Sequence, residues 1–228
     1  MIEHLTQRIY QFFEQERQLK YIPNGVGITS LLACKNKWLL KEKHPELSTK
    51  NVEIANGFIF EFFIKKIFEE WLGEQVVCEY TFTLNYKGLL INPHIDIVIF
   101  RKEAVYIVEI KSMKELRFKV FPEEDIITHK LVKKYEPELP EKYVKQVQLQ
   151  KFFLSKHLDK QNITAYLFIS AVARYKEKSK RVFLEYIPPD IEEEEVDKII
   201  QDWHEKIPLY KWECQRCDYA KICDRFEV

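Results

Sequence analysis

Charged residues interrupt two of the most apolar segments of the chain. Asp96 lies within the segment IDIVIF, and Glu109-Ile110-Lys111 closes the segment VYIVEIK. Burying a carboxylate away from water is costly unless a cation compensates its charge. Because alternate residues of a strand point to the same side, Glu109 and Lys111 share one face while Ile110 turns into the packing. If Asp96 lies at the neighbouring position of an adjacent strand, its oxygens converge with those of Glu109.

The carboxylates of Asp96 and Glu109 form a candidate site for a hard divalent cation, Mg²⁺ or Mn²⁺. The backbone carbonyl of Ile110 is a candidate for a further ligand. Lys111 would orient the attacking water or help to deprotonate it, and would offset negative charge that builds up on a phosphate. The alternative is an ion-pair cluster of the same side chains at a strand edge, and the spacing alone leaves both interpretations open.

Four of the five cysteines form a second pattern. Cys214, Cys217 and Cys223 are spaced as C-x-x-C-x5-C, and Cys34 lies far upstream. Three thiolates this close, with a fourth available, can hold a [4Fe–4S] cluster or a tetrahedral zinc ion. An odd number of cysteines argues against a disulfide framework. Cys78 lies in a strand-like segment and is expected to be a core residue.

The elements that position these residues follow from the hydrophobic periodicity. Helical spacing predicts helices over residues 1–20, 51–72, 141–158 and 190–205, and Thr29 or Ser30 can cap a further helix that carries Cys34. Apolar runs predict strands over residues 76–86, 91–100, 104–113, 163–173 and 181–187. Residues 114–136, which contain Pro122 and many charges, predict a loop. The order of elements indicates an α/β or α+β sandwich with helices flanking a central mixed sheet.

Composition excludes several classes of protein. Hydrophobic residues make up 46% and aromatic residues 14% of the chain, which excludes a disordered polymer. The 36 basic and 36 acidic residues balance to a net charge of +0, so charge alone gives no argument for a nucleic-acid partner. No apolar run approaches the roughly 18 residues that span a bilayer, and the first residues lack the apolar stretch of a signal peptide. We therefore expect a cytoplasmic protein without a membrane partner.

In chain order, the two patterns resemble a known family. The chain is similar to the iron–sulfur nucleases of the RecB-like PD-(D/E)xK superfamily and, more narrowly, to the CRISPR-associated Cas-four exonucleases. The similarity covers residues 28–224, and its motifs are T-S-L-L-A-C-K-N-K-W around Cys34, G-F-I-F-E ending at Glu61, Asp96 followed by E-I-K, the helix around Gln146, and C-x-x-C-x5-C. It implies an α/β fold with a PD-(D/E)xK restriction-endonuclease-like core.

The resemblance also implies a domain organisation. Residues 1–228 would form a single nuclease domain, with the nuclease core at residues 49–187. Residues 28–48 and 206–228 together would form a helical iron–sulfur region that joins the N- and C-terminal segments.

Residue by residue, the resemblance implies two sets of site residues. The [4Fe–4S] cluster would be held by Cys34, Cys214, Cys217 and Cys223. The catalytic residues would be Asp96, Glu109, Lys111 and Gln146. The Mn²⁺ or Mg²⁺ ion would be held by Glu61, Asp96, Glu109 and the Ile110 carbonyl.

Three further positions bear on this assignment. Glu61 stands where the Cas-four family commonly has histidine, and Gln150 stands where tyrosine is usual. A solvent-facing helix is the alternative interpretation of Gln150. His94 lies two residues before Asp96, on the same strand face, and is a candidate to support the metal ligands.

The function implied by the resemblance is metal-dependent cleavage of single-stranded DNA, often by a 5′-to-3′ exonuclease. The cellular role would be the trimming of spacer precursors in CRISPR adaptation, alongside the CRISPR integrase proteins. Two alternatives stay open: a RecB-like iron–sulfur nuclease of DNA repair or of a mobile element, and a non-catalytic scaffold that binds single-stranded DNA and uses the cysteine site as a structural knot.

Overall fold

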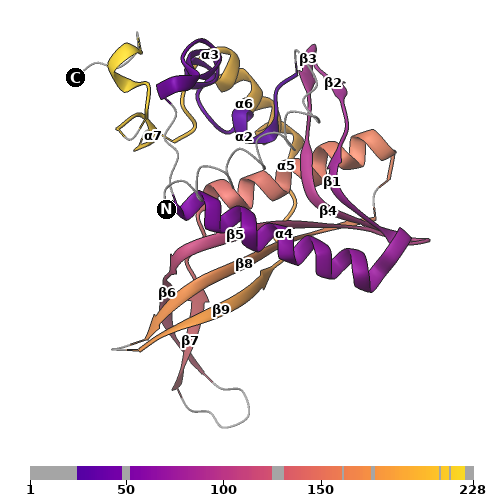
Figure 1. Cartoon of the computed structure of the whole chain (residues 1–228), viewed down its shortest axis with the longest axis vertical. Helices are drawn as coiled ribbons and strands as arrows, with labels where there is room; N and C mark the ends of the chain where they lie inside the picture. Colours follow the sequence, from indigo (N-terminus) through magenta and orange to yellow (C-terminus); the bar gives the residue numbers. More distant parts are fainter. Residues whose placement is uncertain are drawn as a thin grey trace, which may run out of the picture.

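The computed structural model describes residues 25–47, 52–124, 131–160, 162–175, 178–210, 212–215 and 217–223. The helix predicted over residues 1–20 lies outside this part of the chain. Figure 1 shows a sheet packed against helices, with a two-stranded ribbon that projects from the body. Within the described residues, no helix combines the length and apolar character that crossing a bilayer demands.

The centre of the fold is a five-stranded sheet in the order β1-β4-β5-β8-β9. Its strands are β1 (Val76–Thr81), β4 (His94–Phe100), β5 (Val105–Leu116), β8 (Ile163–Tyr175) and β9 (Lys178–Tyr186). β5 and β8 run parallel, whereas the other neighbouring strands are antiparallel. A parallel pair needs a crossover connection, and this one contains α5 (Glu141–Leu158). The predicted central mixed sheet is therefore confirmed.

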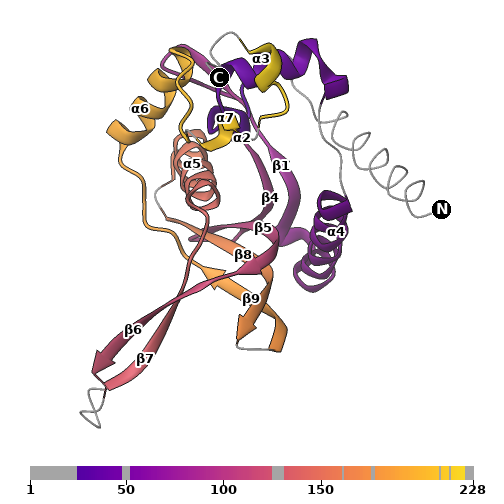
Figure 2. The same cartoon turned by 90° about the vertical axis from the view of Figure 1, so that its left-hand side faces the viewer.

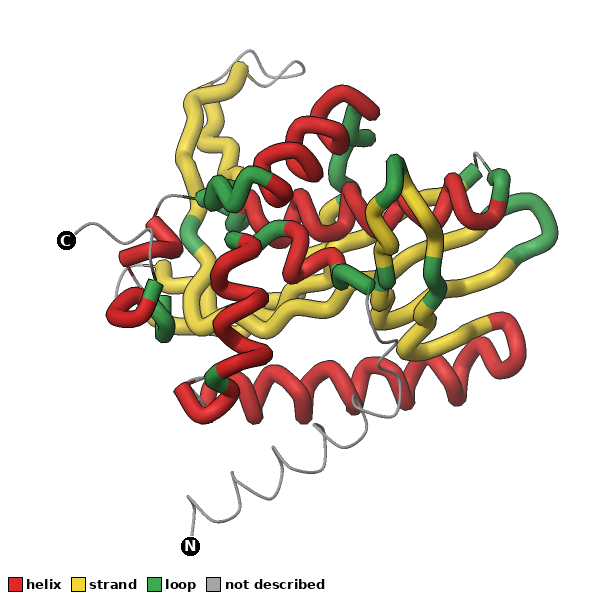
Figure 3. Tube along the Cα trace, turned by 90° about the horizontal axis from the view of Figure 1, so that it is seen from above, coloured by secondary structure: helices red, strands yellow, loops and turns green. Residues whose placement is uncertain are grey.

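Alternate residues of the central strands pack against helices on opposite faces of the sheet. On one face, α4 (Val52–Leu72) covers a cluster made by Ile97, Ile99, Val108 and Ile110. On the other face, a larger cluster joins the sheet to α5 and α6 (Glu193–His204). Figure 2 shows α4 and α5 on opposite sides of the sheet, and Figure 3 shows the strands as a layer between helices. The helices predicted over residues 51–72, 141–158 and 190–205 are thus confirmed.

The segment around Cys34 folds differently from its prediction. Instead of one helix capped by Thr29 or Ser30, it forms α2 (Ile28–Leu31) and α3 (Lys35–Lys43), followed by the 3₁₀ turn η1 (Pro45–Leu47). Cys34 has an extended backbone, with φ −66° and ψ 135°, and separates the two helices. Leu31 and Leu32 at the break are both buried. Tertiary packing of these leucines therefore overrides the helical period of the sequence.

Short elements complete the fold. The segment predicted as one strand over residues 76–86 divides after β1, and β2 (Leu84–Tyr86) pairs with β3 (Leu89–Ile91) in a separate hairpin. Its turn contains Lys87 and Gly88, both at positive φ. The 3₁₀ turn η2 (Gly73–Gln75) joins α4 to β1. Near the C-terminus, Cys214 lies on α7 (Trp212–Gln215), and Cys217 and Cys223 lie on either side of the 3₁₀ turn η3 (Ala220–Ile222).

The loop predicted over residues 114–136 is wrong for its described part. β5 continues to Leu116, and β6 (Phe118–Glu124) pairs with β7 (Leu131–Pro137) in an antiparallel ribbon. The ribbon forms a two-stranded sheet of its own. Pro122 is tolerated because a strand of a two-stranded ribbon has one edge that needs no donor.

Candidate active site

Three carboxylates form a row across the strands β1, β4 and β5. In the register of the β4–β5 ladder, Asp96 lies opposite Glu109. In the register of the β1–β4 ladder, Glu79 lies opposite Asp96. Asp96 is 5% exposed and Glu109 is 2% exposed. Like charges directly opposite each other destabilise a sheet, so this row needs compensating cations.

The local backbone fixes Asp96 beside Glu109. The ladder between β4 and β5 ends at the pair Ile97 and Val108, and beyond it the Ile110 N–H donates to Asp96 Oδ2 at 2.8 Å. The carboxylate thus replaces a backbone acceptor where the strands separate. Both carboxylates line one cavity of about 400 Å³, and such a cavity is in the size range of ligand sites.

Side-chain donors surround Glu109. Lys111 donates to Oε1, Gln146 donates to the same oxygen at 2.6 Å, and Gln150 donates to Oε2 at 2.7 Å. Gln150 also donates to the His94 carbonyl at 2.8 Å and is fully buried. The interpretation of Gln150 as solvent-facing is therefore wrong, and Gln146, like Gln150, contacts Glu109.

Lys65 of α4 supplies a cation that the sequence analysis missed. Its Nζ donates to Glu61 Oε1 at 2.5 Å and to Glu79 Oε1, and lies 3.6 Å from Asp96 Oδ1. Lys65 is 6% exposed, although it lies on an amphipathic helix beside the exposed Lys66. Burial of this lysine is explained by its carboxylate partners. Glu61, one of the predicted metal ligands, is held at the cavity by the same contact.

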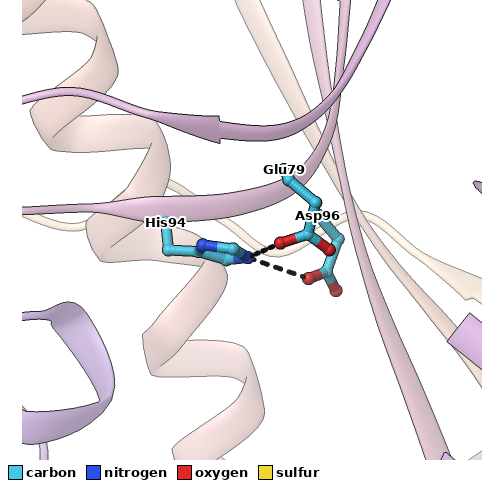
Figure 4. A group of neighbouring side chains, drawn as sticks. All are labelled: Glu79, His94 and Asp96. Carbon is cyan, nitrogen blue, oxygen red and sulfur yellow. Dashed lines mark ion pairs between the residues drawn. The ribbon is translucent and has the colours of Figure 1, made fainter. Parts of the chain in front are cut away.

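Glu79, His94 and Asp96 bring three potential metal-ligand atoms within 4.8 Å of one another. His94 Nε2 lies 2.7 Å from Glu79 Oε2 and 3.9 Å from Asp96 Oδ1, and Figure 4 shows the three side chains pointing toward one another. Glu79 has φ +57°, a left-handed backbone that is uncommon for a glutamate. No sequence pattern indicated Glu79, because its position opposite Asp96 depends on strand register.

This group differs from the metal-ligand set predicted from the sequence. The predicted set was Glu61, Asp96, Glu109 and the Ile110 carbonyl, and the three side chains among them line the same cavity. Among the described residues, however, the group that meets the 4.8 Å spacing contains His94 and Glu79 in place of Glu61 and Glu109. Asp96 is common to both sets.

The charged groups shift one another's pKa values. Burial alone would raise the pKa of Asp96, but Lys65 and Lys111 outweigh it and hold that pKa below its usual range. Burial and the charge of Asp96 raise the pKa of Glu109. Burial opposes the charge on Lys111, yet Glu109 and Asp96 together raise its pKa above the ordinary value. The lysine therefore stays protonated and acts as a fixed positive charge.

A second cavity, of about 250 Å³, gathers the four cysteines predicted to act together. Cys34 from the start of α3, Cys214 on α7, Cys217 and Cys223 all line it. Cys34 Sγ donates to the Lys206 carbonyl at 3.5 Å. Burial and the other three cysteines raise the pKa of the Cys214 thiol. Cys78, as expected, lies apart in β1.

Comparisons with known proteins were made for the whole chain. A family model described as "Nuclease-related domain" (NERD) matches residues 56–174. The match runs from α4 into β8 and includes every carboxylate and lysine described around the first cavity. The four cysteines of the second cavity lie outside it. No curated protein matches the chain.

Two solved structures are similar. The crystal structure of SSO0001 has a TM-score of 0.64 and 16% sequence identity, and covers 100% of this chain and 98% of its own. At that identity the similarity concerns the fold. A crystal structure from Eubacterium rectale, whose name proposes an exonuclease, has a TM-score of 0.34 and 14% identity, and covers 82% of this chain and 66% of its own. That score is too low to support an argument.

Proposed function

Because the chain belongs to the nuclease-related domain family, we propose that it is a metal-dependent DNA nuclease that hydrolyses phosphodiester bonds at the first cavity. The observation that carries the proposal is the buried pair Asp96 and Glu109, opposite each other on adjacent strands, with Lys111 bonded to Glu109. A structural ion-pair cluster would have no need of a cavity, whereas this cluster lines one.

The charges of the cavity fit a divalent cation. Glu61, Glu79, Asp96 and Glu109 are opposed by the two lysines Lys65 and Lys111. When the four carboxylates are ionised and His94 is neutral, two negative charges remain, so the group attracts divalent cations such as Mg²⁺ or Mn²⁺. We propose Asp96, Glu109 and the Ile110 carbonyl as ligands of this ion, and Glu61 as a further ligand at the edge of the set. A divalent cation supplies Lewis-acid polarisation of a phosphoryl oxygen and a nucleophile at neutral pH.

Lys111 is proposed to act at the reacting phosphate. Its ammonium lies beside Glu109, where it can stabilise the negative charge that develops on the phosphate or orient the attacking water and help to deprotonate it. Gln146 and Gln150 act through Glu109, because their amide N–H groups fix both carboxylate oxygens.

The substrate proposed is single-stranded DNA. The carboxylates lie at the wall of a cavity of about 400 Å³ that is also lined by Trp38 and Lys41 of α3. A scissile phosphate must enter this recess, which a flexible single strand does more easily than a duplex. The resemblance to Cas-four exonucleases adds 5′-to-3′ polarity and spacer trimming with CRISPR integrase proteins. DNA repair or a mobile element is the alternative setting for the same chemistry.

The second cavity is proposed to hold a [4Fe–4S] cluster. The donor set supports this proposal, because four cysteine thiolates are the ligands of a [4Fe–4S] cluster and all four cysteines line this cavity of about 250 Å³. Residues 28–48 and 206–228 would then form the iron–sulfur region of a single domain around a core at residues 49–187. Iron and sulfide analysis of anaerobically purified protein distinguishes the cluster from zinc.

The test of function is cleavage of 5′- and 3′-labelled single-stranded DNA with Mn²⁺ or Mg²⁺. Lys111→Met and Asp96→Asn are expected to abolish cleavage. Lys145→Met and Asp190→Asn are matched controls, because their ion pairs lie elsewhere on the surface of the fold. Full activity in folded Lys111→Met protein would refute the proposal, and binding without cleavage under every metal tested would indicate a scaffold.

A further inference from the structure

Two ionisable residues at the first cavity have no role in the proposed reaction. Glu79 lies on β1, on the side of Asp96 away from Glu109, and His94 lies two residues before Asp96 on β4 itself. Asp96 is therefore the middle carboxylate of the row, with one gap on each side. The proposed catalytic ion occupies the gap toward Glu109. The gap toward Glu79 contains the imidazole of His94, as Figure 4 shows.

The separations in this second gap match metal coordination. Ligand atoms about 2.1 Å from an octahedral ion lie about 3.0 Å apart when adjacent and about 4.2 Å apart when opposite. His94 Nε2 lies 2.7 Å from Glu79 Oε2 and 3.9 Å from Asp96 Oδ1. All three ligand atoms lie within 4.8 Å of one another. Small adjustments of these side chains therefore suffice to surround one ion.

Neighbouring groups also contact other atoms of the three ligand residues. Lys65 donates to the other oxygen of Glu79, Oε1, and the Ile110 N–H donates to the other oxygen of Asp96, Oδ2. The Gln150 amide donates to the backbone carbonyl of His94. These contacts orient the three residues, while Lys65 Nζ also lies 3.6 Å from Asp96 Oδ1 and must yield that oxygen to the ion.

We propose that His94 Nε2, Glu79 Oε2 and Asp96 Oδ1 hold a second divalent cation, with Asp96 bridging the two positions. Imidazole favours first-row transition ions over Mg²⁺, so this position takes Mn²⁺ in preference to Mg²⁺. Adjacent strands are about 4.8 Å apart, close to the roughly 3.5–4 Å that separates the ions of two-metal phosphodiester sites. The inference rests on the proposed function for the first ion, whereas occupancy of the second position is measurable without DNA.

The experiment measures Mn²⁺ binding to the full chain by electron paramagnetic resonance in the absence of DNA. Pulsed spectra detect ¹⁴N coupling when an imidazole nitrogen coordinates Mn²⁺. The wild-type protein is expected to show this coupling, and His94→Gln to lose it. Loss of a metal ligand weakens binding at that position by about tenfold or more, and Glu79→Gln is expected to weaken it similarly. His44→Gln is the matched control, because His44 also pairs with a glutamate, Glu46, at 3.3 Å but is exposed.

The outcomes separate this inference from the proposed function. Absence of ¹⁴N coupling in the wild type, or coupling unchanged in His94→Gln, overturns the second position even if Asp96→Asn abolishes cleavage. Coupling that depends on His94 supports the second position even if Asp96→Asn still cleaves DNA. Cleavage by Asp96→Asn would refute the proposed function and not this inference. Thermal unfolding of each variant identifies any that fail to fold, and Glu79→Gln then provides an independent test of the same position.

Discussion

The two cavities are built in different ways. The first gathers its carboxylates from β1, β4 and β5, where strand register aligns them and side-chain or backbone donors hold them. The second gathers cysteines on short elements, the four-residue α7 and the three-residue η3, with Cys34 more than a hundred residues away. Within the described part of the chain, both regions contain a buried side-chain oxygen without a hydrogen-bond partner, Gln150 Oε1 beside Glu109 and Glu213 Oε2 at the second cavity.

This difference indicates what each region requires of its ligand. A site built on a sheet keeps its geometry because the surrounding ladders and core persist when the ligand leaves. A site built on short helical turns has few backbone hydrogen bonds of its own. On our proposal, the [4Fe–4S] cluster supports its surroundings, whereas the divalent cations are held by surroundings that already exist. The predictions below test this contrast.

The largest expected effect is on stability at the second cavity. Cys217→Ser is expected to prevent cluster assembly and to remove the link between Cys34 and the C-terminal cysteines. A cross-link that closes so long a loop contributes up to about 5 kcal/mol by loop entropy. Calorimetry and iron analysis measure the change, with Cys78→Ser as the control. Unchanged melting temperature and iron content in Cys217→Ser would contradict the proposal that the cluster stabilises the second cavity.

At the first cavity we expect the opposite behaviour. Asp96→Asn should lower kcat by about a thousandfold, or about 4 kcal/mol, because it removes the carboxylate shared by both proposed metal positions. Its melting temperature should shift by no more than a few degrees, since the Ile110 N–H still meets an amide oxygen at the same place. Single-turnover cleavage measures the expected fall in rate, and thermal unfolding measures the small expected shift in melting temperature. A large loss of stability without a change in rate would contradict both expectations.

The alkylation rates of the cysteines should also differ, by a smaller factor than the cleavage rates in the previous prediction. Burial, followed by the charge of Glu69, raises the pKa of the Cys78 thiol to about 11. At pH 8 its thiolate fraction, and hence its alkylation rate, should be about a hundredfold below that of an ordinary thiol. Iron removal should expose the cavity cysteines to iodoacetamide and leave Cys78 unaffected. Mass spectrometry measures both, and rapid labelling of Cys78 at pH 8 would contradict the prediction.

The smallest effect concerns the orientation of Glu109. Gln150→Leu removes a donor that stabilises the charged carboxylate, so the pKa of Glu109 should rise further and the acid limb of the pH–rate profile should move to higher pH. We expect kcat to fall by about tenfold, or about 1.4 kcal/mol, with KM nearly unchanged. Gln148→Leu on the same helix is the control, because Gln148 donates to the Pro189 carbonyl. A purely structural role for Gln150 would leave the pH profile in place.

The same variants bear on how stability varies with pH. The pKa of Asp96 is lowered in the folded protein, so its ionised form contributes stability above its unfolded pKa. That contribution is lost as the pH falls through the lowered folded pKa. Asp96→Asn should therefore lose less stability in acid than the wild-type protein, as unfolding measured from neutral to acidic pH would reveal.

Much of the fold was predictable because its elements carry strong periodic patterns. The long helices α4 and α5 and the apolar strands β4 and β5 follow directly from their spacing. The ribbon β6–β7 was missed because Pro122 and the many charges of its segment favour a loop, and the break at Cys34 because it depends on the packing of Leu31 and Leu32.

The candidate site was predictable only where its residues interrupt an apolar run. Asp96, Glu109 and Lys111 do so, and the four cysteines identify themselves by type. Lys65 and Lys66 are adjacent and identical in type, yet only Lys65 is buried. The hydrophobic periodicity of a helix with many charges did not show which of the two lysines faces the core. The role of Glu79 depends on cross-strand register and a left-handed backbone, neither of which a strand-like pattern contains.

The alignment of β4 with β5 has a consequence for how the chain folds. A slip of two residues would leave every apolar side chain on its original face, so the core barely distinguishes the slipped sheet from the native one. It would nevertheless move Asp96 by about 6.6 Å along the strand, away from its position opposite Glu109. A cation that binds only the aligned carboxylates adds its binding free energy to the native alignment alone. It thereby stabilises the native register relative to the slipped one.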